Sequence, residues 1–373
     1  MRIIVVQRFL PHYRYNFYEN VAKQANVSLL YSCKLGEVSK RKWQYKTFGI
    51  SINIKVGHLK DKLVISPFVI FDLYRIKPSI VVLEDISGLP NSLMAMIYCK
   101  ITRTPYLIWG LGNIPSKKRS ILRKLLNPCI EYLYKNSSGF LGYSRHACNI
   151  YSAIGKPTYW VPNATLNRPS TATVEKTLDL ISQKYDVQNY KALRILFIGR
   201  LLHQKKVDLL IYAISTLKIR VKFCLDIIGD GPCAKELQEQ VNQLEIQDKV
   251  TFHGAIYDEA TKNKIIGSCH ISVIPGLGGL AVQESMANGL PVLCGSTDGT
   301  EKDHIINGVN GYLVSEPITV EIIQKMISKF CDLSLYEKEA VSRAALSCVS
   351  TNSIRETMAN AFVASCLATK GQH

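Results

Sequence analysis

The sequence predicts an α/β fold made of two doubly wound, Rossmann-like domains that face a central cleft. The chain of 373 residues is too long for one ordinary core and suits two domains of about 150 to 200 residues each. Short β-rich runs alternate with amphipathic segments along the whole chain, which is typical of parallel sheets covered by helices. A polar stretch at 167–190 separates two series of these runs.

Each series supplies the strands of one domain. The first contains the runs RIIVVQ, VSLLYS, IVVLED, PYLIWG, GFLGYS and TYWVPN, and the second contains RILFIGR, KFCLDIIG, VTFHGA, HISVIPG and PVLCGS. We expect an N-terminal domain over 1–166, a linker over 167–190 and a C-terminal domain over 191–349, with a final helix at about 350–373 that packs back on the first domain. Ligands of open α/β sheets bind outside the carboxyl ends of the strands, so the loops there are the candidate sites.

The composition is that of a globular protein, with 47% hydrophobic and 20% charged residues. No apolar run approaches the roughly 20 residues that span a bilayer. The N-terminal MRIIVVQRFLPHYR predicts a first strand, not a signal peptide. The 11 cysteines are scattered without a C-x-x-C pair, which favours reduced, cytoplasmic thiols over disulfides or zinc.

The positive charge lies in the first half of the chain. Residues 1–165 hold 24 of the 46 lysines and arginines but only 7 of the 29 acidic residues, so they carry the whole net charge of +17. A basic half indicates a polyanionic partner, either an anionic membrane or a nucleic acid. No nucleic-acid recognition motif accompanies the charge, which favours the membrane. A nicotinamide dehydrogenase is disfavoured because the first turn, QRFLPHYR, has no glycine.

A glycine-rich turn in the second half predicts a phosphate site. In VIPGLGGLAVQESMANG, Gly276, Gly278 and Gly279 lead the backbone closely into a helix whose first amides are free, and Gly289 predicts the end of that helix. Glu284 is the one charged residue in this run. Its carboxylate suits the vicinal hydroxyls of a ribose; the alternative is a solvated helix residue beside a tight turn.

Cations follow the first strand of the second series. RILFIGRLLHQKK places Arg200 and Lys205 at the carboxyl end of that strand, where a guanidinium and an ammonium can neutralise a diphosphate. Solvated loop charges are the alternative for this segment alone. Gly229 and Gly231 in IIGDGP allow a flat base to approach the backbone, and Glu301 lies on the loop after PVLCG.

In combination these loops resemble a known family. The order G-R-x-x-x-x-K, IGDGP, P-G-x-x-G-L-x-x-x-E-S-M-A-x-G-x-P-V and NGVNGYLV is similar to the retaining nucleotide-sugar glycosyltransferases of the GT-B fold, family 4, in a subgroup with the P-G-x-x-G-L variant. The match covers nearly all of Leu193 to Val314. The first half matches more loosely, in QRFLPHYRYNFYENVA, RTPYLIWGLGN, GYSRHACNIYSAIG and VPNAT.

The resemblance implies roles for these residues. Arg200, Lys205 and Glu284 would form the catalytic set, in which the two cations hold the donor diphosphate and the carboxylate binds the ribose. The backbone amides around Gly279 to Ala281 would hold the distal phosphate. The full donor-binding set is Gly199, Gly229, Gly231, Gly278, Gly279, Leu280, Ala281, Glu284 and Glu301. Since no D-x-D occurs, we expect no metal, and no cofactor besides a UDP- or GDP-linked sugar as co-substrate.

Three positions depart from the family's pattern. The first glutamate of its E-x-x-x-x-x-x-x-E pair, associated with the hydroxyls of the donor sugar, would fall on Gly276. Leu111 stands where many relatives have a histidine that reaches the donor sugar, and Lys206 replaces a usual glycine. The choice of sugar must then rest on other groups, and a weak or altered catalyst stays open.

Strand ends of the first domain supply the candidates for acceptor binding. Glu84 and Asp85 end IVVLED and either steer the acceptor hydroxyl or cap the next segment. His12 and Arg14, in the first loop, are placed for an acceptor phosphate. The remaining candidates are Asn113 and Ser144.

A basic, amphipathic segment at 114–134 predicts where the first domain meets a membrane. Its leucines share one face and its cations lie largely on the other, as in helices of the headgroup region; an ordinary domain helix is the alternative. The cations are Lys117, Lys118, Arg119, Arg123 and Lys124. We expect a cytoplasmic protein, peripheral on the inner face of the cell membrane.

The resemblance thus implies a metal-independent hexosyl- or related glycosyltransferase. It would move a sugar from a UDP- or GDP-sugar to a hydroxyl of a lipid-linked glycan acceptor in bacterial surface polysaccharide biosynthesis, that is, of lipopolysaccharide O-antigen, capsule or exopolysaccharide. The alternatives are another GT-B enzyme such as an epimerase, an inactive homologue and, remotely, a basic nucleic-acid-binding protein.

Overall fold

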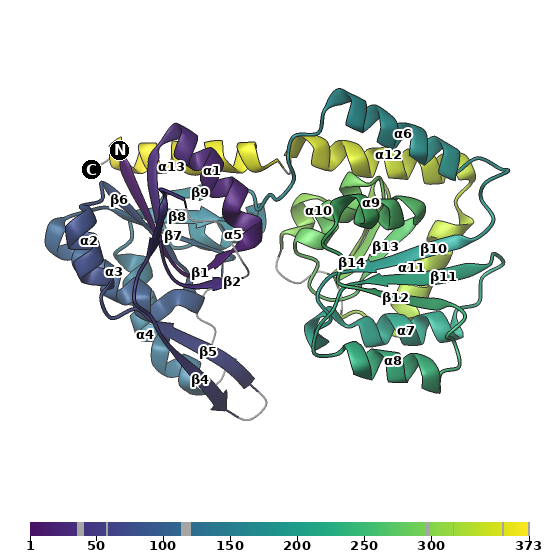
Figure 1. Ribbon diagram of the computed structural model, residues 1–373, viewed down its shortest axis with the longest axis horizontal. Coiled ribbons are helices and arrows are strands. Elements are labelled where there is room, and N and C mark those ends of the chain that lie inside the picture. Colours follow the sequence, from purple (N-terminus) through teal and green to yellow (C-terminus); the bar gives the residue numbers. More distant parts are fainter. Residues whose placement is uncertain are drawn as a thin grey trace. The chain divides into compact units, whose positions relative to one another are not determined.

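The computed structural model of the chain describes residues 1–35, 41–56, 59–112, 121–295, 299–315, 317–352 and 354–371. The chain divides into two compact units, Met1–Thr165 with Arg355–His373, and Leu166–Ile354. Each unit contains a parallel sheet covered by helices, so the predicted pair of Rossmann-like domains is confirmed (Figure 1). All the predicted strand-like runs form strands. Among the described residues, no helix is both long and apolar enough to cross a membrane.

The first unit contains a seven-stranded sheet in the order β3-β2-β1-β6-β7-β8-β9, with every pairing parallel. Its strands are β1 (Arg2–Pro11), β2 (Asn26–Leu35), β3 (Gln44–Lys46), β6 (Ile80–Glu84), β7 (Tyr106–Gly110), β8 (Gly139–Gly142) and β9 (Thr158–Trp160). A separate antiparallel hairpin is formed by β4 (Ile50–Val56) and β5 (Leu59–Ile65). The central strands are apolar runs because both faces of a parallel sheet are buried.

Helices cover both faces of this sheet. They are η1 (His12–Arg14), α1 (Tyr15–Gln24), α2 (Val69–Ile76), η2 (Ile86–Gly88), α3 (Leu89–Thr102), α4 (Ile121–Lys135), α5 (Arg145–Ser152) and α13 (Arg355–Gly371). On one face α13 packs against α1, where the rings of Phe362 and Phe17 lie 5.5 Å apart. On the other face α2, α3 and α4 bury Leu73, Met96 and Leu133 in one cluster.

The second unit contains a six-stranded parallel sheet in the order β12-β11-β10-β13-β14-β15. Its strands are β10 (Leu193–Ile198), β11 (Phe223–Ile228), β12 (Val250–Gly254), β13 (Ile271–Ile274), β14 (Val292–Gly295) and β15 (Gly311–Val314). The strand order reverses between β10 and β13. This is the topological switch point, outside which ligands of such sheets bind.

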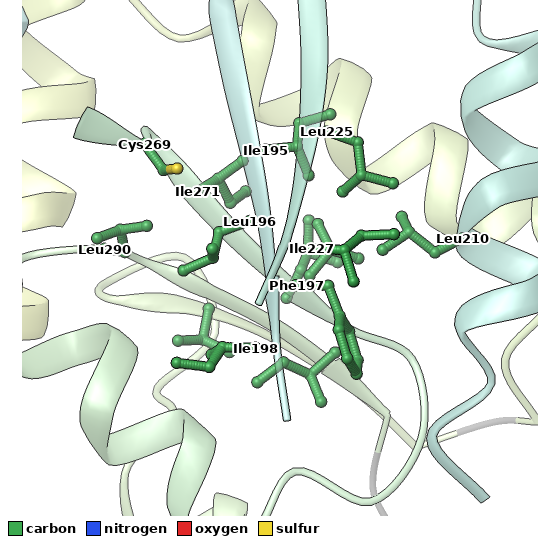
Figure 2. Packing of buried hydrophobic residues seen from close by; sticks show 14 of the residues in the cluster. Ile195, Leu196, Phe197, Ile198, Leu210, Leu225, Ile227, Cys269, Ile271 and Leu290 are labelled. Carbon is green, nitrogen blue, oxygen red and sulfur yellow. The ribbon is translucent and has the colours of Figure 1, made fainter. Parts of the chain in front are cut away.

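Helices cover the second sheet on both faces as well. They are α6 (Thr171–Lys184), η3 (His203–Lys205), α7 (Val207–Thr216), α8 (Ala234–Gln243), α9 (Glu259–Ser268), α10 (Leu280–Ala287), η4 (Glu301–Asp303), α11 (Val320–Asp332) and α12 (Leu335–Asn352). Along β10 the side chains alternate between the two faces. Figure 2 shows Ile195 and Phe197 on the side of Leu210 from α7, and Leu196 on the side of Leu290.

The segment 167–190, expected as a linker, holds α6. The hydroxyl of Ser170 caps this helix by accepting the N–H of Thr173 (3.1 Å). Ile181 and Tyr185 are buried in the core of the second unit, and the Tyr185 hydroxyl donates to the carbonyl of His270 (3.1 Å). The polar residues that suggested a linker form the exposed side of a packed helix.

Candidate functional site

Two loops are joined at the switch point of the second sheet. The loop after β10 carries Arg200, which is exposed, and runs into η3 with Lys205. The loop after β13 carries the glycine-rich turn. The N–H groups of Gly276 and Leu277 donate to the carbonyls of Lys205 (3.1 Å) and Gln204 (3.2 Å). The ammonium of Lys205 donates in turn to the carbonyl of Leu277, so a cation of the first loop lies against the second.

This joint requires a glycine at position 276. A Cβ atom on Gly276 would lie 2.0 Å from the carbonyl oxygen of Gln204 and 2.7 Å from the Cα of Lys205. These are backbone atoms, which cannot rotate away as the end of a flexible side chain can. A glutamate at this position is therefore incompatible with the observed loop arrangement.

The glycine-rich turn leads into the start of α10 through Gly279. Gly279 precedes the helix with φ +58° and ψ −139°, a conformation that is rare for any residue with a side chain. The space that its side chain would occupy is open. The N-cap residue Gly279 has no side chain to cap α10, and the first amides of the helix, those of Leu280 and Ala281 included, lie at the positive end of the helix dipole, where an anion is stabilised. The predicted end of the helix is confirmed, since Gly289 has φ +71°.

Glu284 lies on α10 with a side chain that is 30% exposed. Its Oε1 lies 2.6 Å from the Nζ of Lys262 on α9, and Lys262 also pairs with Glu259 (3.1 Å). Burial by itself lowers the pKa of Lys262, but the hydrogen bond and charge of Glu284 raise that pKa overall. The ammonium therefore stays charged and fixes the carboxylate on the helix.

Lys262 is the residue of this site that the sequence did not predict. Its helix, EATKNKIIGS, carries two lysines with the same local appearance. The sequence does not show which of the two lysines is partly buried in an ion pair and which is solvated. Only the proximity of α9 and α10 in the fold reveals the pair.

The loops after β10 and β11 also approach each other through glycines. A Cβ atom on Gly229 would lie 2.0 Å from the carbonyl oxygen of Gly199, and one on Gly231 would lie 2.3 Å from that of Leu201. The N–H of Gly199 donates to the carbonyl of Ile228 (3.0 Å). These glycines allow the two loops to pack closely against each other, at the residues that flank Arg200.

Glu301 and Gly278 support the glycine-rich turn from behind. Glu301, at the start of η4, is fully buried. A Cβ atom on Gly278 would lie 2.9 Å from the Sγ of Cys294 and 3.9 Å from the Cβ of Glu301. The structure thus places Glu301 beneath the turn, where its side chain is shielded from solvent.

In the first unit, Arg14 is buried. Its guanidinium donates to Oδ1 of Asn163 (2.7 Å) and to Sδ of Met358 (2.9 Å). It also lies 5.3 Å from the ring centroid of Trp109 and 5.0 Å from that of Tyr143. These contacts occupy the guanidinium inside the core, so the geometry assigns Arg14 a structural role in place of the expected contact with an acceptor phosphate.

Asp85 is buried too. Its carboxylate accepts hydrogen bonds from the hydroxyls of Tyr134 and Tyr151, the latter at 2.8 Å. Burial, followed by the charge of Asp85, raises the pKa of Tyr151 well above its usual value, so this phenol stays protonated and donates. Asp85 makes no side-chain cap for η2. Its carboxylate, just after β6, thus links helices α4 and α5 to the end of that strand.

Glu84 and Ser144 complete the described acceptor candidates. Ser144 is fully buried and caps α5 by accepting the N–H of Ala147 (3.0 Å). Glu84 pairs with Arg8 at 3.1 Å, and its side chain keeps 20% of its surface exposed. Glu84 is thus the candidate in this group whose carboxylate still meets solvent.

Several predicted residues lie outside the described part of the chain. These are Asn113, Lys117, Lys118 and Arg119, together with the side chains of His12, Arg123 and Lys124. The membrane contact expected at 114–134 therefore stays a prediction.

One group of side chains beside the loop after β10 has the chemistry of a metal site. Within the described residues, the ligand atoms of His203, Cys233 and Glu236 lie within 4.8 Å of one another. Nitrogen, sulfur and carboxylate ligands together suit a zinc-class ion. His203 and Glu236 are exposed, and no fourth described residue joins the group, so it carries no assigned role.

Part of this chain is similar in sequence to known proteins. Residues 182–345 match the family model of glycosyl transferases group 1. MJ1607 of Methanocaldococcus jannaschii, an uncharacterized glycosyltransferase, is 34% identical over 31% of this chain and 30% of its own length. Protein CapJ of Staphylococcus aureus is 26% identical over 66% of this chain and 62% of its own length. The chain therefore spans less than two thirds of either relative.

Solved structures share the fold of both units. The Anabaena protein Alr3699/HepE, solved in complex with UDP and glucose, matches with a TM-score of 0.68 over 99% of this chain and 100% of its own, at 16% identity. Identity at this level shows the fold alone. The two Rossmann-like units are those of the GT-B glycosyltransferase fold.

Proposed function

We propose that this protein is a retaining, metal-independent glycosyltransferase that moves a sugar from a UDP- or GDP-sugar to a hydroxyl of a lipid-linked glycan acceptor in bacterial surface polysaccharide biosynthesis. The observation that carries the proposal is the meeting of Arg200, Lys205 and the start of α10 at one switch point. The match of 182–345 to glycosyl transferases group 1 supports the reaction class. The UDP and glucose bound by Alr3699/HepE support the donor class.

The chemistry follows from the charge that develops on the leaving group. As the bond between the anomeric carbon and the diphosphate breaks, negative charge grows on the distal phosphate. Arg200 through its planar fork, Lys205 as a point charge, and the first amides of α10 stabilise that charge. The acceptor oxygen then bonds to the same face of the sugar, and its proton passes to the departing phosphate. No protein nucleophile is needed, and the anomeric configuration is retained.

The nucleoside is positioned by Glu284 in this proposal. A carboxylate has about four acceptor sites on its two oxygens. Lys262 occupies one of them at Oε1, which leaves capacity for the two hydroxyls of a ribose. The ion pair thus orients the carboxylate without exhausting it.

The acceptor side of the proposal places the first unit on an anionic membrane. An aromatic face, defined here as Phe48, Phe68, Phe71 and Tyr74, is formed by α2, the residue before it and the segment between β3 and β4, with exposed fractions of 60%, 51%, 70% and 41%. The rings of Phe48 and Phe68 lie 5.8 Å apart and those of Phe68 and Phe71 6.3 Å apart, so these three rings are continuous, and Tyr74 lies one helical turn after Phe71 on α2. Large exposed apolar patches mark interaction sites.

Cations flank this aromatic face, which favours an anionic bilayer as its partner. Arg75 and Lys77 lie at the end of α2, and Lys100 and Arg103 at the end of α3; all four are exposed. Figure 1 shows α2 and α3 next to each other in the first unit. Aromatic side chains that enter the headgroup region, with basic neighbours on anionic lipids, would hold the enzyme where a lipid-linked acceptor lies.

The test of the reaction is a donor screen followed by a transfer assay. We expect one class of nucleotide sugar to raise the melting temperature, because a donor that binds only the folded state stabilises it. That donor should then lose its sugar to a membrane extract that contains lipid-linked glycan, with the anomeric configuration kept. Binding of no UDP- or GDP-sugar to a folded protein would remove the proposal.

One observation favours an altered enzyme as the second candidate. The backbone contact at Gly276 excludes the glutamate associated with the donor sugar. An epimerase would change the bound sugar without any acceptor, and an inactive homologue would bind donor without turnover. Analysis of the sugar product in the absence of acceptor separates these outcomes from transfer.

A further inference from the structure

A pocket lies at the amino ends of the strands in the second unit, on the opposite side of the sheet from the loops of the candidate site. It has a volume of about 500 Å³ and lies at the amino ends of β10 and β13, the same strands whose carboxyl ends carry the donor loops. This volume is within the range of small-molecule sites, about 300 to 1,000 Å³. The lining residues come from α6, the segment before β10, the start of β10, α9 and the residue before β13.

The lining is basic. Lys184, Lys191 and Arg194 contribute cations, and none of the described residues that line the pocket is acidic. Asp226 lies behind Arg194 and accepts from its Nε (3.2 Å) and Nη2 (2.9 Å). The Arg194 side chain also hydrogen-bonds with Cys224, and because a guanidinium has five N–H donors, it can still donate to a further acceptor. The pocket therefore presents more positive charge than its own walls neutralise.

Lys184 is the decisive residue of this pocket. Its ammonium nitrogen is buried and has no hydrogen-bond acceptor among the described residues. The ring of Tyr185, 6.0 Å from the nitrogen, is a weak substitute for a counter-ion. Burial lowers the pKa of Lys184 to about 8. A buried ammonium without an acceptor is costly, so its presence beside a pocket points to an external partner.

His270 adds a neutral donor to the same wall. Its Nδ1 accepts the backbone N–H of Arg194 (3.0 Å). Burial, and then the charges of Lys184 and Arg194, lower the pKa of His270 to about 3. The ring is therefore neutral with its proton on Nε2, which can donate but cannot compete for an anion as a carboxylate would.

We propose that this pocket is a binding site for a small phosphate-bearing anion, whose oxygens accept hydrogen bonds from the ammonium of Lys184 and from the remaining N–H groups of the Arg194 guanidinium. Phosphate fits because it accepts several charge-assisted hydrogen bonds at once, from a fork and a point charge together. The pocket exceeds the size of inorganic phosphate, so the natural ligand carries a further organic group. The site is distinct from the donor site, because the two lie at opposite ends of β10 and β13.

Binding supplies the counter-ion that Lys184 lacks. The bound anion raises the pKa of Lys184 toward its ordinary value, so binding near pH 8 is accompanied by proton uptake. The bound anion also links α6 to the beginning of β10, because Lys184 lies on α6 and Arg194 on β10. The folded second unit is stabilised by the anion in proportion to its occupancy.

The test is a thermal-unfolding and calorimetric titration with inorganic phosphate and with sulfate, against chloride at equal ionic strength. We expect both oxyanions to raise the melting temperature and chloride not to. Lys184→Met should melt higher than wild type without anion, because it removes a buried unpaired charge, and should bind phosphate at least tenfold more weakly. Lys176→Met, on the exposed side of the same helix, is the matched control and should bind as wild type does.

Two further variants separate this pocket from the donor site and from a failure to fold. Arg200→Ala should keep the oxyanion response if the response comes from the Lys184 pocket. Lys191→Ala, at an exposed position, should weaken phosphate binding several-fold without affecting folding. An unchanged response in both Lys184→Met and Lys191→Ala, or a response lost in Arg200→Ala, overturns the proposal.

Discussion

Lys262 holds Glu284 across two helices of the second unit, with Nζ and Oε1 2.6 Å apart. The ammonium is shared with Glu259, which lies on its own helix at 3.1 Å. A side chain that the sequence leaves unremarked thus determines where the proposed ribose-binding carboxylate points. The proposed donor site is therefore built from three loops and one ion pair.

Replacement of Lys262 tests this arrangement. Lys262→Met should raise the KM for the donor several-fold while kcat changes less, because the carboxylate loses its orientation but the diphosphate contacts stay. Lys262→Arg keeps the charge and should retain most of the affinity. Steady-state kinetics with both variants decide the matter; equal donor KM in Lys262→Met and wild type would contradict a positioning role.

Arg200 and Lys205 should contribute more to kcat/KM than any other side chains. Arg200→Ala and Lys205→Ala should each lower kcat/KM by about two to three orders of magnitude, since one key contact to a developing oxyanion contributes about 3 to 4 kcal/mol. Lys205→Ala should also lower the melting temperature, because its ammonium joins the loop to the carbonyl of Leu277. Near-normal turnover in both variants would defeat the assignment.

The sheets and the positions of the glycine-rich and charged loops between strands could be predicted from the sequence, because parallel strands are continuous apolar runs and their loops are marked by glycine and charge. The roles of Arg14 and Asp85 could not. Each sits at a strand end, as functional residues do, but its burial depends on aromatic residues far away in the sequence, such as Trp109 and Tyr151. Polarity at a strand end predicts a position and leaves the direction of the side chain undetermined.

Helix α6 and the hairpin β4–β5 show two other limits. The polar surface of α6 hid Ile181, whose packing requires the rest of the unit. Among the described residues, the hairpin strands ISINIKV and LKDKLVI pair with each other, outside the seven-stranded sheet. The first alternates apolar and polar residues and the second does not, so neither has the continuous apolar run that marks a buried parallel strand.

Position 276 should tolerate no side chain. Gly276→Ala places a Cβ atom 2.0 Å from the carbonyl of Gln204, and relief of such a clash typically costs about 1 to 3 kcal/mol. Denaturant unfolding should show this loss together with weaker donor binding, because the loop with Lys205 must shift. Gly267→Ala is the control: its added Cβ meets nothing within 4 Å, so stability should be kept or improved.

Acid should destabilise the second unit through two buried histidines. Burial lowers the pKa of His304 to about 4 and that of His270 to about 3, whereas an unfolded histidine titrates near 6.5. As the pH falls below 6.5, the unfolded chain binds protons that the folded chain does not, so stability falls with pH. Each histidine should lower the free energy of unfolding by about 2 kcal/mol between pH 7 and pH 5.

Urea unfolding at pH 7 and pH 5 measures this difference. His304→Gln removes one titrating group and should reduce the pH dependence by about half. The absolute stability of this variant can differ from wild type, so the comparison rests on the change with pH. An identical pH dependence in the variant and the wild type would assign the acid effect to other groups.

The aromatic face should govern membrane attachment. The double variant Phe68→Ser, Phe71→Ser should bind anionic vesicles about tenfold more weakly, because two exposed rings no longer enter the headgroup region. Wild-type binding should also fall as salt is added, since the flanking cations act through a screened charge interaction. Tyr336→Ser removes an even more exposed aromatic residue, 82% exposed, from the second unit and should bind as wild type does.

Co-sedimentation with anionic and neutral vesicles distinguishes the possible occupants of the aromatic face. Binding to anionic vesicles that needs Phe68 and Phe71 supports attachment to the membrane through this surface. If the wild type instead binds neither vesicle and forms a dimer that the double variant lacks, the face joins two copies of the chain. In that case the lipid-linked acceptor would need another way to reach the enzyme, because neither α2 nor α3 would be free to meet the bilayer.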